Sequence, residues 1–146
     1  MSLARKFKSS SKSANEGINI TLEDCINTDG TIPTFKVRRN SMQNKLYAKA
    51  IMELNDKALA KYGVTSIDQL TPEQNEAEDL GVFIDAVLVG WENVELEDGI
   101  KFPYSKENAI TLFSDPDWYD LMIKIKVGAS SVKGFSADLV SKITKN

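Results

Sequence analysis

The sequence contains no histidine and only one cysteine, Cys25, in 146 residues. Histidine is the side chain that most often moves protons near neutral pH, and it is also the commonest metal ligand. A lone cysteine forms no disulfide within the chain, and a cysteine nucleophile normally needs a neighbouring base. We therefore expect Cys25 to be an ordinary small side chain near a turn, and the protein to have no catalytic residues.

Motifs for phosphate and metal binding are also missing. The eight glycines are scattered along the chain and do not form a phosphate-binding loop. Asp115, Asp117 and Asp120 are close in sequence, but the glycine and the closing glutamate of an EF-hand loop are absent, and Pro116 is typical of a helix start. The acidic residues of 92–98 could pair as general acid and base, although acids around an exposed turn are usually solvated. We expect no cofactor, no metal and no enzymatic activity.

No apolar run approaches the roughly 20 residues that are needed to cross a bilayer. The longest run, residues 86–91, is interrupted by Gly90. The basic start of the chain is not followed by the apolar stretch of a signal peptide. The sequence therefore predicts a protein of the cytoplasm without a membrane partner.

The net charge of −3 conceals an uneven distribution of charge along the chain. Residues 62–100 contain many acidic side chains but no lysine or arginine, whereas residues 1–12 and the segment after residue 120 are rich in lysine. A basic tail can indicate nucleic-acid contact, but this one carries only Phe7 as an aromatic residue, and the body is acidic. The pattern argues against nucleic-acid binding, and the acidic central part could steer a basic protein partner.

The chain length fits one domain. Residues 1–17 are rich in serine, lysine and asparagine and are predicted to be a flexible basic tail. We expect residues 18–146 to form a single domain. It begins with a β-hairpin over about 18–39, because two alternating apolar patterns flank the turn residues of 27–30.

Helices are predicted over the rest of the chain. The first spans about 41–62, with Ser41 as its N-terminal cap and Gly63 after its end. The second spans about 72–92, where a capping box precedes apolar residues at helical spacing that end with Trp91. The later helices are expected at about 105–113 and 116–127, followed by a weak C-terminal helix within 129–146. The predicted fold class is mainly α, in the α+β sense, as a small helical domain with an N-terminal β-hairpin.

Short motifs follow one another in a fixed order from residue 90 onward. They are Gly-Trp-Glu-Asn-Val at 90–94, Glu-Asp-Gly at 97–99, Phe-Pro-Tyr-Ser at 102–105, Glu-Asn-Ala at 107–109, Leu-Phe at 112–113 and Asp-Pro-Asp at 115–117. This series resembles a family of small tail assembly chaperones of tailed bacteriophages, whose pattern runs GWENV–DEDG–PF–ENA–LF–DLP. The front of the chain is also similar, with Lys-Phe-Lys at 6–8, Arg-Arg at 38–39 and Asn-Lys-Leu-Tyr at 44–47.

The resemblance implies a non-catalytic function in phage assembly. Proteins of that family bind the tape measure protein, keep it soluble and help to recruit tail tube subunits. They act in the cytoplasm of the bacterial host and are absent from the mature virion. The alternative is a structural component of the tail or head–tail junction that is retained in the virion. Self-association is open.

Five aromatic residues lie between positions 91 and 118, and most of them are expected to form core. One or two could stay partly exposed as anchors for a partner, because tryptophan and tyrosine are favoured at binding hot spots. Trp91 and Tyr104 are the candidates, since each carries a polar group at one end of an apolar ring. Together with Glu97 and Asp98 of the acidic turn, they form the predicted partner-binding site.

Overall fold

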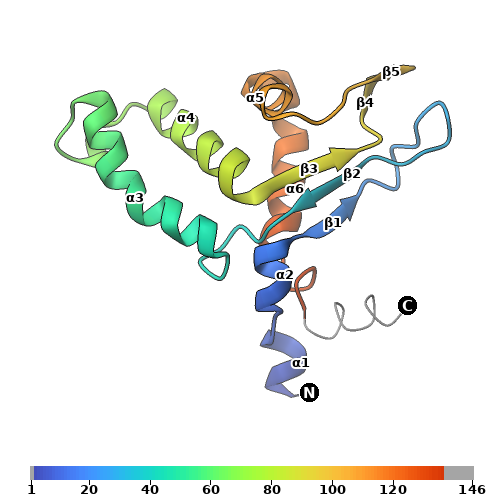
Figure 1. Ribbon diagram of the computed structural model, residues 1–146, viewed down its shortest axis with the longest axis horizontal. Helices are drawn as coiled ribbons and strands as arrows, with labels where there is room; N and C mark the ends of the chain where they lie inside the picture. Colours follow the sequence, from blue (N-terminus) through green and yellow to red (C-terminus); the bar gives the residue numbers. More distant parts are fainter. Residues whose placement is uncertain (1, 137–146) are drawn as a thin grey trace.

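The computed structural model describes residues 2–136 and has an α+β fold, as the sequence predicts. A three-stranded antiparallel sheet lies at its centre, and two helices form an arm that projects to one side (Figure 1). The elements follow in the order α1 (Leu3–Phe7), α2 (Ser11–Glu16), β1 (Ile18–Thr21), β2 (Thr34–Val37), α3 (Lys45–Tyr62), η1 (Ile67–Gln69), α4 (Pro72–Val82), η2 (Phe83–Val87), β3 (Leu88–Glu92), β4 (Glu95–Glu97), β5 (Ile100–Lys101), α5 (Lys106–Ser114), η3 (Pro116–Trp118) and α6 (Tyr119–Ser130).

The expected N-terminal hairpin is confirmed, because β1 and β2 pair in antiparallel register. Ile18 lies opposite Val37 and Ile20 lies opposite Phe35. Phe35 and Val37 are both buried, so the alternating pattern does mark the face that packs on the core. Because an isolated hairpin is only marginally stable in water, this pairing depends on the elements that cover it.

The prediction of one helix over 72–92 is wrong in its last third. Helix α4 ends at Val82, η2 makes a wider π-helical turn, and β3 then pairs with β2 as the third strand of the sheet. The apolar residues of this segment fit a helical spacing, but the same spacing is compatible with a strand. In β3, which pairs with β2 beside Phe35, the side chains of Leu88 and Trp91 are both buried. The β-branched Val89 favours a strand, and the glycine at position 90 is unfavourable in a helix interior.

The N-terminal segment also differs from the predicted flexible tail. Residues 3–7 and 11–16 form α1 and α2, and the side chain of Ser10 accepts a 3.1 Å hydrogen bond from the Ser13 amide at the start of α2. Ala14 is fully buried, and its carbonyl oxygen accepts a hydrogen bond from the backbone N–H of Arg39. Ser2 and Ser10, which resemble linker residues in the sequence, therefore act as helix caps.

Helix α3 begins at Lys45 and not near Ser41, because Asn44 is its N-terminal cap. Asn44 Oδ1 accepts hydrogen bonds from the backbone N–H groups of Leu46 and Tyr47. Its Nδ2 donates to the carbonyl oxygens of Arg39 and Ala86, at 3.0 and 2.8 Å. Asn44 thus joins the start of α3 to the end of η2 at the base of the arm.

The far end of the arm follows the predicted capping chemistry. Gly63 has a φ of 65° and ends α3 in the left-handed conformation that glycine adopts most easily. Thr71 and Gln74 form the expected capping box at the start of α4. Between the helices, the hydroxyl of Tyr62 donates a 2.7 Å hydrogen bond to Glu78.

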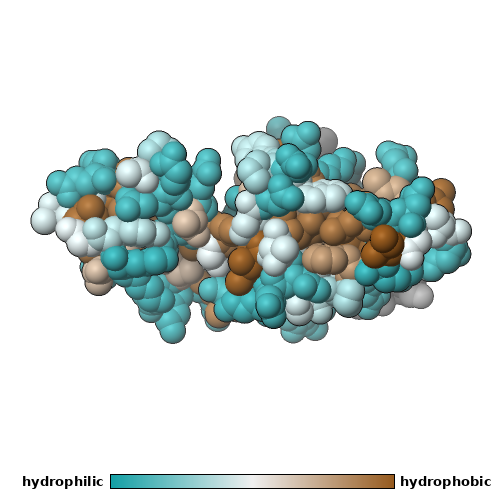
Figure 2. Space-filling model, turned by 90° about the horizontal axis from the view of Figure 1, so that it is seen from above, coloured by the Kyte–Doolittle hydropathy of each residue, from teal (hydrophilic) through white to brown (hydrophobic). Residues whose placement is uncertain are grey.

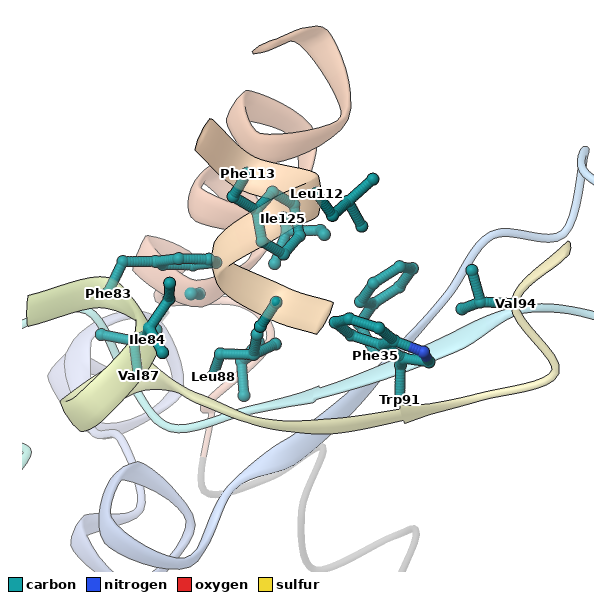
Figure 3. Close-up of a cluster of buried hydrophobic side chains, with 13 residues drawn as sticks. Phe35, Phe83, Ile84, Val87, Leu88, Trp91, Val94, Leu112, Phe113 and Ile125 are labelled. Carbon is teal, nitrogen blue, oxygen red and sulfur yellow. The ribbon is translucent and has the colours of Figure 1, made fainter. Parts of the chain in front are cut away.

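Helices α5 and α6 pack against one face of the sheet (Figure 3). Ser105 caps α5 as predicted, with its hydroxyl accepting from the Asn108 amide. Helix α6 continues to Ser130, beyond the expected end near residue 127, and Gly128 lies inside it. Of the expected C-terminal helix, 129–130 belong to α6, 131–136 form a turn and a bridge to Ser9, and the rest lies outside the described residues.

A cluster of buried side chains from the sheet, η2, α5 and α6 forms the core between these layers (Figure 3). Its members are Phe35, Val37, Phe83, Ile84, Val87, Leu88, Trp91, Val94, Ala109, Leu112, Phe113, Ile125 and Ala129. Within residues 2–136, no helix combines the length and the apolar character that crossing a membrane requires.

Candidate partner-binding surface

Trp91 lies inside the aromatic cluster and is only 7% exposed. Its ring stacks on Phe102 with centroids 5.8 Å apart, and it lies nearly perpendicular to the ring of Tyr104, with centroids 5.0 Å apart. Its Nε1 donates a 2.7 Å hydrogen bond to the carbonyl oxygen of Phe102. The expectation that Trp91 stays partly exposed is therefore wrong, because both its ring and its polar group have partners in the protein.

Tyr104 is 36% exposed and lies at the margin of this cluster. The Tyr104 ring lies over Gly90 of β3, and a Cβ at position 90 would be in ordinary van der Waals contact with it at 3.6 Å. Tyr104 packs against Trp91 on one side, and part of its surface remains accessible to a partner.

Glu97 and Asp98 are exposed at the turn between β4 and β5. In the described part of the chain, neither carboxylate belongs to an ion pair. The neighbouring Glu95 is different, because its Oε1 accepts hydrogen bonds from the Gly99 amide and the Thr28 hydroxyl. These bonds, that of Gly99 first, lower the pKa of Glu95, so this carboxylate holds the turn in place.

The turn is also tied to the loop between β1 and β2. Lys101 Nζ lies 2.9 Å from Asp29 Oδ2, and Asp29 Oδ1 accepts hydrogen bonds from the hydroxyl and the amide of Thr31. The hydrogen bond from the Thr31 side chain, followed by that from Lys101, holds the pKa of Asp29 well below its usual range. These contacts give the acidic turn a defined position but leave Glu97 and Asp98 in solvent.

A groove of about 700 Å³ lies between α4 and the segment that runs from the end of α5 into α6. No sequence motif indicates it, because its walls are far apart along the chain. Its apolar side chains are Ala77, Leu80, Phe113, Pro116, Tyr119, Met122 and Ile123, and its polar ones are Glu73, Glu76, Asp79, Ser114, Asp115 and Lys126. The groove is thus apolar inside and acidic at its margin.

A stripe of exposed apolar side chains continues from this groove along α6. Tyr119, Ile123 and Val127 are 56%, 38% and 63% exposed. They follow at intervals of four residues, which places them on one helical face. In the view from above, hydrophilic side chains cover most of the α3–α4 arm at the left, and hydrophobic ones reach the surface of the body (Figure 2). We call Tyr119, Ile123 and Val127 the α6 stripe.

The acidic margin of the groove is not neutralised by the protein itself. Across residues 2–136, no ion pair involves Glu73, Glu76, Asp79 or Asp115. Lys126, which also lines the groove, lies with its Nζ 5.5 Å from the centroid of the Phe83 ring. The absence of lysine and arginine from residues 62–100 is the sequence signal that could have indicated this acidic wall.

The aspartates after α5 have a structural role in the fold. Asp115 Oδ1 accepts a 3.0 Å hydrogen bond from the Asp117 amide and caps the turn that begins at Pro116. Among the described residues, no three histidine, cysteine, aspartate or glutamate side chains gather in an arrangement that could hold a metal ion. Cys25 is exposed.

Comparison with known proteins gives one family. No curated protein sequence and no solved structure shows a significant match to the chain. The family model described as YdaY prophage protein matches residues 42–146, which is most of the chain. The match includes α3 to α6 and therefore both walls of the groove and the α6 stripe. The chain belongs to the YdaY prophage protein family and is phage-derived.

Proposed function

We propose that this protein is a phage tail assembly chaperone. It binds the tape measure protein, keeps it soluble and helps to recruit tail tube subunits, without catalysing a reaction. The proposal is supported by the ordered motifs at 90–117, which resemble that class of protein, and by the phage origin of the family. The structural observation that carries it is the α6 stripe beside an apolar groove.

Contiguous apolar surface on a soluble protein marks a place where another molecule binds. The α6 stripe has a firm support, because Ile125 and Ala129 on the opposite side of α6 are fully buried in the core. A rigid apolar face next to a groove suits the helix-in-groove mode of recognition, in which the partner contributes an amphipathic helix. A chaperone of this kind shields apolar client helices until assembly replaces it.

The proposed site of action is the cytoplasm of the bacterial host during assembly. The protein would leave before the tail is complete and would be absent from the mature virion. Mass spectrometry of purified virions tests this part. Stoichiometric presence of the protein would instead support a structural component of the tail or head–tail junction.

Co-expression tests the chaperone function directly. The tape measure protein of the same phage is produced with and without this protein, and its soluble fraction and elution profile are compared. We expect more soluble tape measure protein and a complex that co-elutes. Equal solubility in both cultures together with no complex would contradict the proposal.

A further inference from the structure

We infer that the groove between α4 and α6 binds an amphipathic helix of the client whose apolar face is flanked by lysine or arginine. The inference rests on the proposed chaperone function, and it adds the place of binding and the chemistry of the bound segment. It is carried by the shape of the groove, by its apolar lining and by the charge of its margin.

The lining of the groove suits apolar side chains from a helix. Phe113 is buried at its base, and Leu80 and Met122 are half-buried on its two walls. Ile123 lies at the margin and belongs to the α6 stripe as well, so the apolar surface continues out of the groove. A helix lying here could insert one row of side chains between α4 and α6 and cover the stripe with the next row.

The acidic side chains on the wall formed by α4 favour a bound helix that is basic. Glu73, Glu76 and Asp79 follow at intervals of three residues, so they form a row that rises about 9 Å along the axis of α4 while it turns about 120° around the helix. The lysines or arginines of a helix that lies alongside, at positions three or four apart, have the same spacing. Such a helix would neutralise a row of charges to which the described part of this chain brings no ion-pair partner.

The same charges disfavour a second copy of this chain as the occupant through a symmetric contact. A two-fold contact centred on the groove would place both acidic rows within one interface. Like charges that face each other across an interface cost free energy, so the acidic margin opposes this pairing. A partner of opposite charge relieves the repulsion and is attracted over a longer distance.

The test uses peptides of about 25 residues tiled along the tape measure protein, long enough to form a stable helix. Binding to the full chain is measured by fluorescence anisotropy at about 0.1 M salt, where the Debye length is about 10 Å. We expect the peptides that bind to be amphipathic and net basic. Glu76→Lys with Asp79→Lys should weaken their binding about tenfold, because attraction becomes repulsion.

The matched control is Glu23→Lys with Asp24→Lys, which changes the net charge equally at the exposed turn after β1. We expect this variant to bind within about twofold of the wild type, since these positions lie outside the groove. Ile123→Ser provides a second variant that removes apolar contact and keeps the charge. Circular dichroism and thermal unfolding establish that each variant is folded.

Several outcomes would overturn the inference. The first is that the peptides that bind are acidic or neutral. The second is equal peptide binding by the wild type and by the variant with Glu76→Lys and Asp79→Lys, the groove variant. The third is a concentration-dependent dimer of this chain that the groove variant abolishes. If the whole tape measure protein co-elutes equally with wild type and groove variant, the groove is not the site, although the chaperone proposal stands. If the wild type forms no complex with the tape measure protein, both fail.

Discussion

The indole of Trp91 is bonded to the backbone of Phe102 and stacked on its ring. Nε1 of Trp91 donates a 2.7 Å hydrogen bond to the Phe102 carbonyl oxygen, while the two ring planes lie 13° apart. This pair joins β3 to the chain that leads into α5, so it fixes the position of α5 above the sheet. Two residues that the sequence presents as parts of separate motifs therefore form one structural unit.

Trp91→Phe tests this unit, because it keeps an aromatic ring and removes the donor. We expect the free energy of unfolding to fall by about 1–3 kcal/mol, since the partly buried carbonyl oxygen of Phe102 loses its hydrogen bond. Urea unfolding followed by circular dichroism measures the change. Tyr104→Phe, which removes an accessible hydroxyl from the neighbouring ring, is the control and should change stability by less than about 0.5 kcal/mol.

Asn44→Ala should be among the most destabilising single substitutions in the arm. The Asn44 side chain is fully buried and makes hydrogen bonds to Arg39, Leu46, Tyr47 and Ala86. Its loss removes a helix cap and leaves buried backbone groups without partners, at a cost of about 2–4 kcal/mol.

Ser41→Ala is the matched comparison for Asn44, because the sequence predicts Ser41 as the cap of the same helix. Within residues 2–136, Ser41 Oγ accepts only from the Gln43 amide, at 3.3 Å. We expect a cost of about 0.5 kcal/mol or less in thermal or urea unfolding. A larger effect for Ser41→Ala than for Asn44→Ala would contradict the structure.

Gly128→Ala tests the contact between α6 and β1. A Cβ at position 128 would lie 2.6 Å from Cδ1 of Ile20, so the isoleucine must move. We expect a loss of about 1 kcal/mol in the wild type, because the cost of overpacking exceeds the gain in helix propensity. In an Ile20→Ala background the same change should be stabilising, since the obstructing atoms are gone.

Gly81→Ala is the control for Gly128→Ala. Gly81 also lies in a helix, but a Cβ there would meet no atom within 4 Å. We expect a gain of about 0.5–1 kcal/mol from helix propensity alone. Urea unfolding of the two alanine variants should therefore give changes of opposite sign, and equal changes would mean that α6 does not approach β1 this closely.

Asp29 predicts a pH dependence of stability. Its pKa is held well below the usual range, mainly by the hydrogen bond from the Thr31 hydroxyl and then by that from Lys101. The pKa is therefore lower in the folded chain than in the unfolded chain, where it is about 3.9. The carboxylate stabilises the folded state above about pH 4, and this contribution is lost as the pH falls toward the folded pKa.

Asp29→Asn removes the titrating group and tests this linkage. We expect the variant to be less stable than the wild type at neutral pH, and the difference to narrow below about pH 4. Urea unfolding across the acid range measures both curves. Asp56→Asn, at an exposed position on α3, controls for the loss of one negative charge. A constant difference between wild type and Asp29→Asn at all pH values would contradict the assigned contacts.

Local chemistry explains where the sequence predictions are right. Gly63, the Thr71–Gln74 capping box and Ser105 all act within a few residues of the chain, so their role is readable from sequence. Residues 88–92 are different, because their apolar spacing fits a helix as well as a strand. Only pairing with β2, which lies far away in the sequence, decides between the two.

The same distinction applies to the site. The aromatic content of residues 91–118 predicts a cluster. Which of its side chains are buried depends on tertiary packing, and this places Trp91 inside the cluster and Tyr104 at its margin. The groove joins Glu76 of α4 to Ile123 of α6, and no local pattern connects two such distant positions. The spacing of Tyr119, Ile123 and Val127 was visible in the sequence, but not their exposure.

Ile123→Ser separates a role in binding from a role in folding. Ile123 is 38% exposed on α6, so its replacement should lower the free energy of unfolding by no more than about 1 kcal/mol. If the α6 stripe covers the client, the variant should nevertheless lose most of its ability to keep the tape measure protein soluble during co-expression. Met52→Ser on α3 is the control, because Met52 is 75% exposed and lies on the arm away from the groove. It should match Ile123→Ser in stability and the wild type in client solubility. Equal solubility with both variants would mean that the apolar surface of α6 does not contact the client.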